Sequence, residues 1–245
     1  MQARFYFPEE SAILKLILML LQLLYANPGI AVAWLVGILL SLTVHEFSHA
    51  LIAKWRGDRT GEREGRLTLN PLAHLDLMGF IPLILFGFGW AKPVPYNPYN
   101  LKNPKWDSVA VALGGPAANL VLAILAAIMI QVLVRGQVFT GLNLLVVFLF
   151  LLILLNLSLL FFNLIPIHPL DGSKLFFALF DHPRYERLRA FVAFRGPQIL
   201  LTLVLVSAFT PLNPFFFVTG PAYATCDLLL QGSCQQFLSS IFAGF

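Results

Sequence analysis

The chain has 245 residues, of which 58% are hydrophobic and 11% are charged, and its mean hydropathy is +0.80. So little polar surface excludes a soluble domain of this size, and we expect one integral membrane domain over residues 1–245, an all-α polytopic protein surrounded by the lipid bilayer. The 16 Lys and Arg outnumber the 12 Asp and Glu. Because no RNA- or DNA-binding module is visible, we interpret this excess as the positive-inside signal and not as nucleic-acid binding.

Two apolar segments open the chain. Residues 12–26 predict an N-terminal helix, and because no small-residue cleavage site follows it, we expect this helix to remain as an anchor. After a turn, residues 29–54 predict a second helix. Within residues 29–53 only three groups are ionisable, namely His45, Glu46 and His49. An ionisable group in hydrocarbon costs about 2.5–3.5 kcal/mol on insertion scales, so these three point to a function.

The sequence HEFSH at residues 45–49 is an H-E-x-x-H pattern. A helix places residues four apart on one face, so His45 and His49 can bind one metal ion while Glu46 reaches the water on that ion. His49 lies roughly 8 Å along the helix axis from Lys54, which places the pattern inside the membrane but near one face. The alternative is a buried polar cluster that only holds helices together.

Residues 56–104 connect this helix to the next long one. A loop rich in charge covers residues 56–66, and the alternation in residues 65–71 indicates a short strand, compatible with a β-hairpin. Residues 76–90 are apolar but too short to span, and glycine and proline interrupt them. The Pro- and Asn-rich residues 89–104 are expected to form a structured cap at the membrane face.

We predict that residues 76–90 are re-entrant. If they crossed the membrane, Asp171 would emerge on the face opposite His45 and His49. If they turn back, all three residues meet on one face. The re-entrant topology also leaves Arg135 as the only one of the 16 Lys and Arg on the far side of the membrane.

Three later segments are apolar enough to span the membrane, residues 107–134, 142–165 and 196–212, which makes about five to six transmembrane helices in all. The last is reached through a basic loop that contains Arg184, Arg187, Arg189 and Arg195. The C-terminal region, residues 196–245, ends in an apolar tail that holds both cysteines. A Cys226–Cys234 disulfide is predicted if this tail lies on an oxidising face, and two buried free thiols are the alternative.

A hydrolytic metal site usually has three protein ligands, and Asp171 is the strongest candidate for the third. It follows the 142–165 helix where Pro166 and Pro169 interrupt helical hydrogen bonding and Gly172 allows a tight turn. Its carboxylate can therefore point back into the bundle. The alternative is an ordinary Asp-Gly turn at a helix end.

Three motifs together resemble the site-2 protease family of intramembrane zinc metalloproteases, peptidase family M50. They are HEFSH at residues 45–49, GGPAAN at 114–119 and NLIPIHPLDG at 163–172. Their order and spacing agree with that family's catalytic three-helix core, which would occupy residues 29–180. The segments GRLTLNP (65–71) and AKPVP (91–95) resemble the compact subgroup that has no PDZ or CBS domain.

The resemblance implies that His45, His49 and Asp171 hold one zinc ion per chain and that Glu46 is the general base and then the proton donor. It implies a substrate that is the transmembrane helix of another protein. Asn119 and Asn163 correspond to polar positions of the motifs and could hold the unwound substrate or stabilise the oxyanion. Their alternative role is an interhelical hydrogen bond.

His168 departs from the family pattern. It could be a fourth ligand, a proton shuttle or a pH-sensitive gate, and a solvated residue at the membrane interface is the reading that we favour.

A different class of protein with the same residues would be a non-hydrolytic metal transporter or scaffold. A transporter should carry acidic or histidine residues on several spans, whereas here they gather near one face, which favours the enzyme. For its location we predict a bacterial plasma membrane with the active site toward the cytoplasm. The sequence does not identify the substrate or the oligomeric state, and it does not say whether an earlier cleavage is required.

Overall fold

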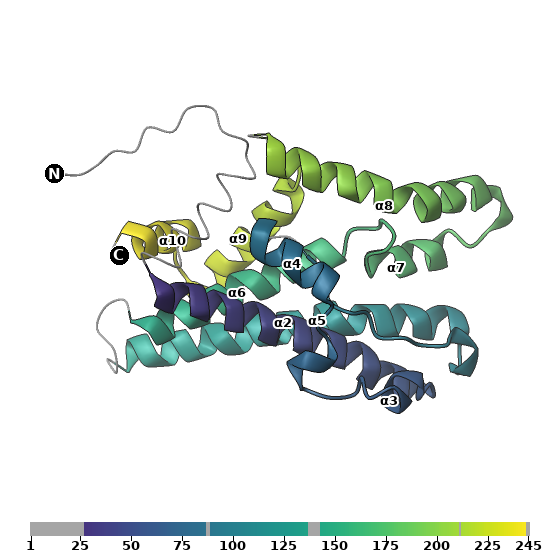
Figure 1. Cartoon of the computed structure of the whole chain (residues 1–245), viewed down its shortest axis with the longest axis horizontal. Helices are drawn as coiled ribbons and strands as arrows, with labels where there is room; N and C mark the ends of the chain where they lie inside the picture. The colour runs from purple at the N-terminus through teal and green to yellow at the C-terminus, as the bar shows by residue number, and fades with distance from the viewer. Residues whose placement is uncertain (1–26, 87–88, 137–142, 211, 244–245) are drawn as a thin grey trace.

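The computed structural model describes residues 27–86, 89–136, 143–210 and 212–243, and these form helices joined by turns without any strand (Figure 1). The predicted helix over residues 12–26 lies outside the described residues. The long helices are α2 (Pro28–Arg56), α5 (Pro104–Arg135), α6 (Leu144–Asn163) and α8 (Glu186–Phe209). The shorter ones are α3 (Thr60–Arg63), α4 (Leu77–Phe86), α7 (Gly172–Leu179), α9 (Phe216–Leu230) and α10 (Cys234–Ala243), with 3-10 turns at Pro71–Ala73, Pro98–Asn100 and Pro183–Tyr185.

Four of the described helical stretches are long and apolar enough to cross a membrane: Pro28–Arg56, Pro104–Val134, Leu144–Asn163 and Pro183–Ser207. Their ends carry ordinary helix signals. Asn103 and Asn143 cap α5 and α6 by accepting the N–H groups of the third residue on. Gly57, at φ +115°, ends α2 in the left-handed conformation that glycine tolerates best. The structure is therefore the expected all-α polytopic membrane protein.

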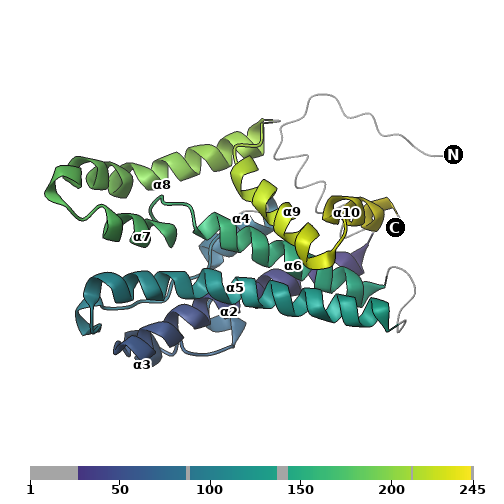
Figure 2. The same ribbon diagram turned by 180° about the vertical axis from the view of Figure 1, so that it is seen from behind.

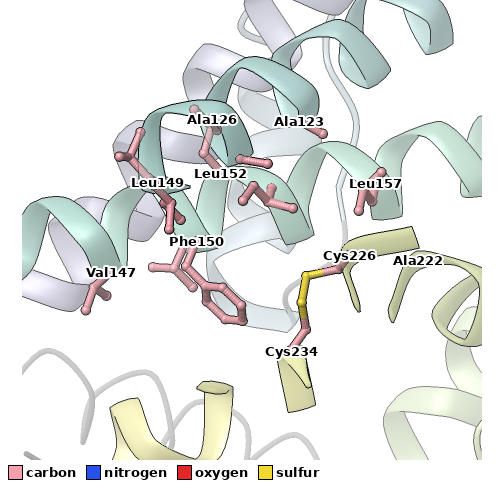
Figure 3. Close-up of a cluster of buried hydrophobic side chains, with 14 of the residues drawn as sticks. Ala123, Ala126, Val147, Leu149, Phe150, Leu152, Leu157, Ala222, Cys226 and Cys234 are labelled. Atoms are coloured by element: carbon pink, nitrogen blue, oxygen red, sulfur yellow. A yellow bond between two sulfur atoms is a disulfide. The ribbon is translucent and has the colours of Figure 1, made fainter. Parts of the chain in front are cut away.

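The core of the bundle lies where α6 packs against α2 and α5. Small residues of α5, Ala123, Ala126 and Ala127, are buried against the large side chains of α6, of which Phe150 and Ile153 are completely buried (Figure 3). Small residues let helix backbones approach closely, which is the usual basis of helix packing in lipid. This packing fixes the three helices that carry the three motifs.

The C-terminal region forms two helices where the sequence suggested only an apolar tail. Helices α9 and α10 are joined by a Cys226–Cys234 disulfide, so the predicted disulfide is confirmed. Helix α9 packs along one side of α6 (Figure 2). Phe237 of α10 meets Phe150 of α6 with the two rings tilted and their centroids 4.6 Å apart. The last span also begins earlier than predicted, because α8 starts at Glu186 after a turn that His182 caps. Arg187, Arg189 and Arg195 consequently lie on this helix and not in a loop.

Helix α4 is short and the chain turns back after it, as a re-entrant segment requires. Its ten residues measure about 15 Å, half of what a span requires. The chain on either side of it meets again, because Lys92 N donates to His74 O at 2.8 Å and Trp90 Nε1 donates to Asp76 Oδ2 at 3.0 Å. The segment therefore returns to the end of the bundle that it left.

The short strand expected over residues 65–71 is wrong. The guanidinium of Arg66 is buried and donates to the carbonyl oxygens of Ala73, Lys92 and Pro93. The backbone of residues 65–71 wraps around this side chain and runs directly into the Pro71–Ala73 turn, so it has no partner strand to pair with. Arg66 is the only buried residue of this segment, so the alternation of leucines with polar residues does not mark the buried face of a strand.

Residues 91–97, which we call the strap, follow the re-entrant segment and cross the end of α2. Arg66 holds the beginning of the strap, and Asp58 holds its end. The buried carboxylate of Asp58 accepts hydrogen bonds from Thr60 N and Oγ1, from Asn97 N at 2.7 Å and from Asn100 Nδ2 at 2.8 Å. Burial acts to raise the pKa of Asp58, but the hydrogen bonds from Asn100, Thr60 and Asn97 outweigh it and hold the pKa below its ordinary value.

We predict that Asp58→Ala lowers the thermal unfolding temperature in detergent at pH 7, because each buried donor left unpaired costs about 1–3 kcal/mol. The folded-state pKa of Asp58 lies below the unfolded value, so its stabilisation is present above about pH 4 and is lost as the pH falls through the folded pKa. The difference between the variant and the parent should therefore narrow as unfolding is measured below pH 4. A difference that stays constant from pH 7 to pH 3 would contradict this role.

Candidate metal centre

Helix α2 brings two imidazoles together inside the bundle. His45 and His49 are both buried, and their Nε2 atoms are 3.0 Å apart. Asp171 joins them from the turn between α6 and α7, with its Oδ2 atom 3.2 Å from His45 Nε2 and 3.4 Å from His49 Nε2. The fold thus brings the three predicted ligand residues to one point, as the re-entrant topology requires.

The turn that carries Asp171 is shaped by the residues around it. Helix α6 ends at Asn163, and Pro166 and Pro169 keep the following residues out of a helix. A Cβ atom on Gly172 would lie 2.3 Å from Leu164 O, so only glycine lets the chain fold back this tightly. The tight turn aims the carboxylate of Asp171 at the histidines.

The residues present fit a zinc ion. With ligand bonds of 2.0–2.1 Å, the donor atoms of a tetrahedral site are about 3.3 Å apart, and the three observed separations are 3.0, 3.2 and 3.4 Å. The Oδ2 atom of Asp171 is buried without a hydrogen-bond partner. Three acceptor atoms that converge without a donor are best satisfied by a cation, and three protein ligands leave a fourth position for water or substrate.

Each histidine is held through its other ring nitrogen. The Nδ1 atom of His49 donates to Val111 O at 2.8 Å, and the Nδ1 atom of His45 donates to Asn119 Oδ1 at 2.6 Å. Because a carbonyl oxygen can only accept, Nδ1 of His49 carries the proton and its Nε2 is left free as a ligand. Partners of this kind fix the ring orientation of metal-binding histidines.

The GGPAAN motif on α5 makes room for the site. A Cβ atom on Gly115 would lie 2.5 Å from both His49 Nε2 and His45 Cε1, so α5 can lie against the imidazoles only because this residue is glycine. Asn119, one turn later on α5, reaches His45 from the same direction. The motif therefore gives the two histidines of α2 the space that they occupy and gives His45 a hydrogen-bond partner.

Glu46 lies beside the histidines, and the potential ligand atoms of His45, Glu46 and His49 are all within 4.8 Å of one another. Its Oε2 atom accepts the backbone N–H of Val94 in the strap at 3.1 Å. The strap lies across this carboxylate, anchored by Arg66 on one side and Asp58 on the other. This fixes the direction in which the carboxylate points.

The two asparagines of the motifs differ in their surroundings. Asn119 is fully buried, and its amide bonds to His45, Asn156 and Ser41, so it has no free group for a substrate or an oxyanion. These contacts match the alternative role, an interhelical hydrogen bond. Asn163 is half-buried at the end of α6, where its Nδ2 donates to Leu159 O.

His168 is half-buried and takes no part in the convergence of ligand atoms. Burial and the neighbouring charge of Lys174 lower its pKa.

Sequence reasoning missed the roles of Asn156 and Gly115. A lone asparagine inside a long aliphatic run was the available signal for the first.

Comparison with known proteins gives one consistent answer. The model of peptidase family M50 matches residues 33–205. The chain is 39% identical over 146 residues to "Putative zinc metalloprotease YwhC" of Bacillus subtilis, a match that covers 57% of this chain and 65% of the relative, just under two thirds of its length. It is 34% identical over 204 residues to "Putative zinc metalloprotease Rip2" of Mycolicibacterium smegmatis, covering 77% of this chain and 71% of the relative. No solved structure gives a significant match.

We predict that Gly115→Ala lowers the affinity for zinc on the order of 10- to 100-fold, the scale seen when the surroundings of metal ligands are disturbed. The added methyl group has to displace the imidazoles of His45 and His49. Gly220→Ala is the matched control, because a Cβ atom there meets nothing within 4 Å. Zinc content of the purified proteins by elemental analysis, and chelator competition, are the measurements. Full zinc occupancy in the Gly115 variant at limiting zinc would overturn this view of the site.

Proposed function

The chain belongs to peptidase family M50, and we propose that it is a zinc-dependent endopeptidase that cuts transmembrane segments of other membrane proteins. The observation that carries this proposal is the convergence of His45, His49 and Asp171 inside the bundle, with the carboxylate of Glu46 beside them. Two imidazoles, a carboxylate ligand and a neighbouring general base are the groups that metal-assisted peptide hydrolysis requires.

The depth of the site supports a substrate within the membrane. His49 is seven residues from Arg56, the last residue of α2, which is about 10 Å along the axis. The site thus lies within a helix that is long and apolar enough to span, and not beyond its end. A helical substrate hides its carbonyl groups in its own hydrogen bonds, so the segment to be cut has to unwind locally.

Zinc, when bound, would lower the pKa of its water toward 7 and polarise the scissile carbonyl. Glu46 accepts a proton from the attacking water as the new C–O bond forms. Glu46 then gives this proton to the amine nitrogen as the C–N bond breaks. The N–H of Val94 holds Glu46 Oε2, so the other carboxylate oxygen is available for the proton. Asn163, beside the turn that leads to Asp171, is proposed to contact the unwound substrate through its Oδ1.

The transporter alternative receives no support from the spans. Residues 108–134 of α5 and the whole of α6 contain no ionisable residue. An ion pathway through the bundle would need such groups at several depths. In α2, α5 and α6 the ionisable residues instead gather at the metal centre and at the helix ends, and Arg195 of α8 is the one that lies further inside a described span.

Charge and the disulfide support the proposed orientation. Arg135 ends α5 at the end of the bundle opposite α3, while the basic residues of α2, α3 and the start of α8 lie at the other end (Figure 1). By the positive-inside rule, the end that carries the metal centre faces the cytoplasm. Disulfides persist in oxidising compartments. The Cys226–Cys234 bond lies near the far end, where Gln131 of α5 bonds Leu229 O of α9, and this supports a plasma membrane with the tail outside.

We predict that Glu46→Gln keeps one zinc ion per chain but lowers cleavage of a membrane-anchored substrate by at least about 10²-fold, since it removes the proton acceptor. His49→Ala should lose both zinc and cleavage. The measurements are zinc content and the rate of substrate cleavage in proteoliposomes. Unimpaired cleavage by the Glu46→Gln protein would sink the mechanism.

Sided labelling tests the topology. Tyr99 is 91% exposed beside the strap, and Gly136 is exposed after α5. We expect Tyr99→Cys to resist a membrane-impermeant thiol reagent in intact cells and to react in inside-out vesicles, and Gly136→Cys to behave in the opposite way. The native cysteines do not interfere because they form a disulfide. Reaction of Tyr99→Cys in intact cells, with Gly136→Cys protected there, would contradict the re-entrant topology in its proposed orientation. Reaction of both positions from the same side would contradict α5 as a span.

A further inference from the structure

We propose that Asn156 is a positioning residue for the metal centre, which acts through Asn119 to hold His45 with its Nε2 atom presented to zinc. This rests on the proposed role of His45 as a zinc ligand. Asn156 lies on α6 within an otherwise aliphatic stretch, and none of the three motifs contains it.

A chain of hydrogen bonds joins Asn156 to His45. Asn119 Oδ1 accepts from His45 Nδ1 at 2.6 Å, and Asn119 Nδ2 donates to Asn156 Oδ1 at 2.7 Å. Asn156 Nδ2 donates to Ser41 Oγ at 2.8 Å and to Leu152 O at 2.8 Å. Ser41 Oγ in turn donates to Gly37 O at 2.7 Å. The chain links α2, α5 and α6.

The direction of this chain is set at its far end. The oxygen of Leu152 is a backbone carbonyl and can only accept, so the NH₂ group of Asn156 has to face it. The Oδ1 atom of Asn156 then faces Asn119 as an acceptor, which requires the NH₂ group of Asn119 to donate. Asn119 is left with its oxygen toward His45, and the Nδ1 atom of His45 has to carry the proton. The lone pair on Nε2 is thereby directed to the metal.

Burial leaves these side chains no other hydrogen-bond partners and so fixes the direction of the chain. Ser41, Asn119 and Asn156 are all fully buried, so within the bundle each polar atom depends on these partners. Without Asn156, the amide of Asn119 can turn over and present its NH₂ group to His45 Nδ1. That arrangement favours the proton on Nε2, which opposes zinc binding. If zinc binds to His45 without Asn156 present, Asn119 has to keep its oxygen toward His45. Its NH₂ group has then lost Asn156 and keeps only one acceptor, the carbonyl oxygen of Ser41 at 3.4 Å.

His49 provides an internal control. Its Nδ1 proton is held by a backbone carbonyl, that of Val111, which no side-chain substitution removes. Loss of Asn156 should therefore disturb His45 and leave His49 unchanged. A general loosening of the bundle would disturb both.

The test compares the full-length protein with Asn156→Leu, Asn156→Asp and the control Thr43→Val. Thr43 is a buried residue of α2 whose hydroxyl donates only to Leu39 O of the same helix. Zinc affinity is measured by chelator competition, and the Nδ1 protons of the two histidines are followed by NMR in the zinc-loaded, ¹⁵N-histidine-labelled protein. A buried aspartic acid stays protonated and can both accept and donate like the amide, so Asn156→Asp should rescue.

We expect Asn156→Leu to lower zinc affinity about tenfold and to shift or broaden the His45 Nδ1 proton signal only, with Asn156→Asp and Thr43→Val close to the parent. Unchanged affinity and an unchanged His45 signal in Asn156→Leu would overturn the proposal while leaving the zinc enzyme intact. Equal changes at both histidines would also overturn it, as would failure of Asn156→Asp to rescue. If the parent protein binds no zinc at these histidines, the proposed function itself fails.

Discussion

Two imidazole nitrogens and one carboxylate oxygen face one another within 3.4 Å in the interior of a membrane helix bundle. Such acceptors cannot be left there without a positive charge between them, because little water reaches them and each lone pair lacks a donor. The other features of the structure serve this requirement. Helix α2 supplies the two histidines one turn apart, and the re-entrant segment and the tight turn before α7 bring Asp171 to the same end of the bundle.

The groups around His45, His49 and Glu46 come from separate helices and from the strap, and they act in different ways. On α5, Gly115 allows close approach and Asn119 holds His45, while α6 holds Asn119 through Asn156. The strap, fixed by Arg66 and Asp58, places a backbone N–H on Glu46. The packing of α2, α5 and α6 is consequently inseparable from the geometry of the site, because a shift of α5 or α6 moves a group that orients His45 or His49.

The sequence was sufficient for the class of protein, for the ligand set as a hypothesis and for the re-entrant segment, since these depend on local patterns and on the parity of spans. The sequence was insufficient to predict contacts that a side chain makes with a distant segment or another helix. Alternation around Arg66 resembled a strand because an inward-facing arginine cannot be told from a strand residue by pattern alone. Asn119 resembled a substrate contact because its motif does not reveal which way the helix turns it, and Asn156 belongs to no motif at all. The start of α8 was misplaced because arginines suggested a loop where the helix had already begun.

The central claim is that His45, His49 and Asp171 bind one zinc ion. Zinc K-edge X-ray absorption on the purified protein tests it most directly. The account predicts one zinc ion per chain with nitrogen and oxygen ligands at about 2.0–2.1 Å and the outer scattering of two imidazoles, together with loss of zinc in Asp171→Ala. A sulfur shell at about 2.3 Å, or full zinc occupancy in Asp171→Ala with an unchanged spectrum, would contradict it.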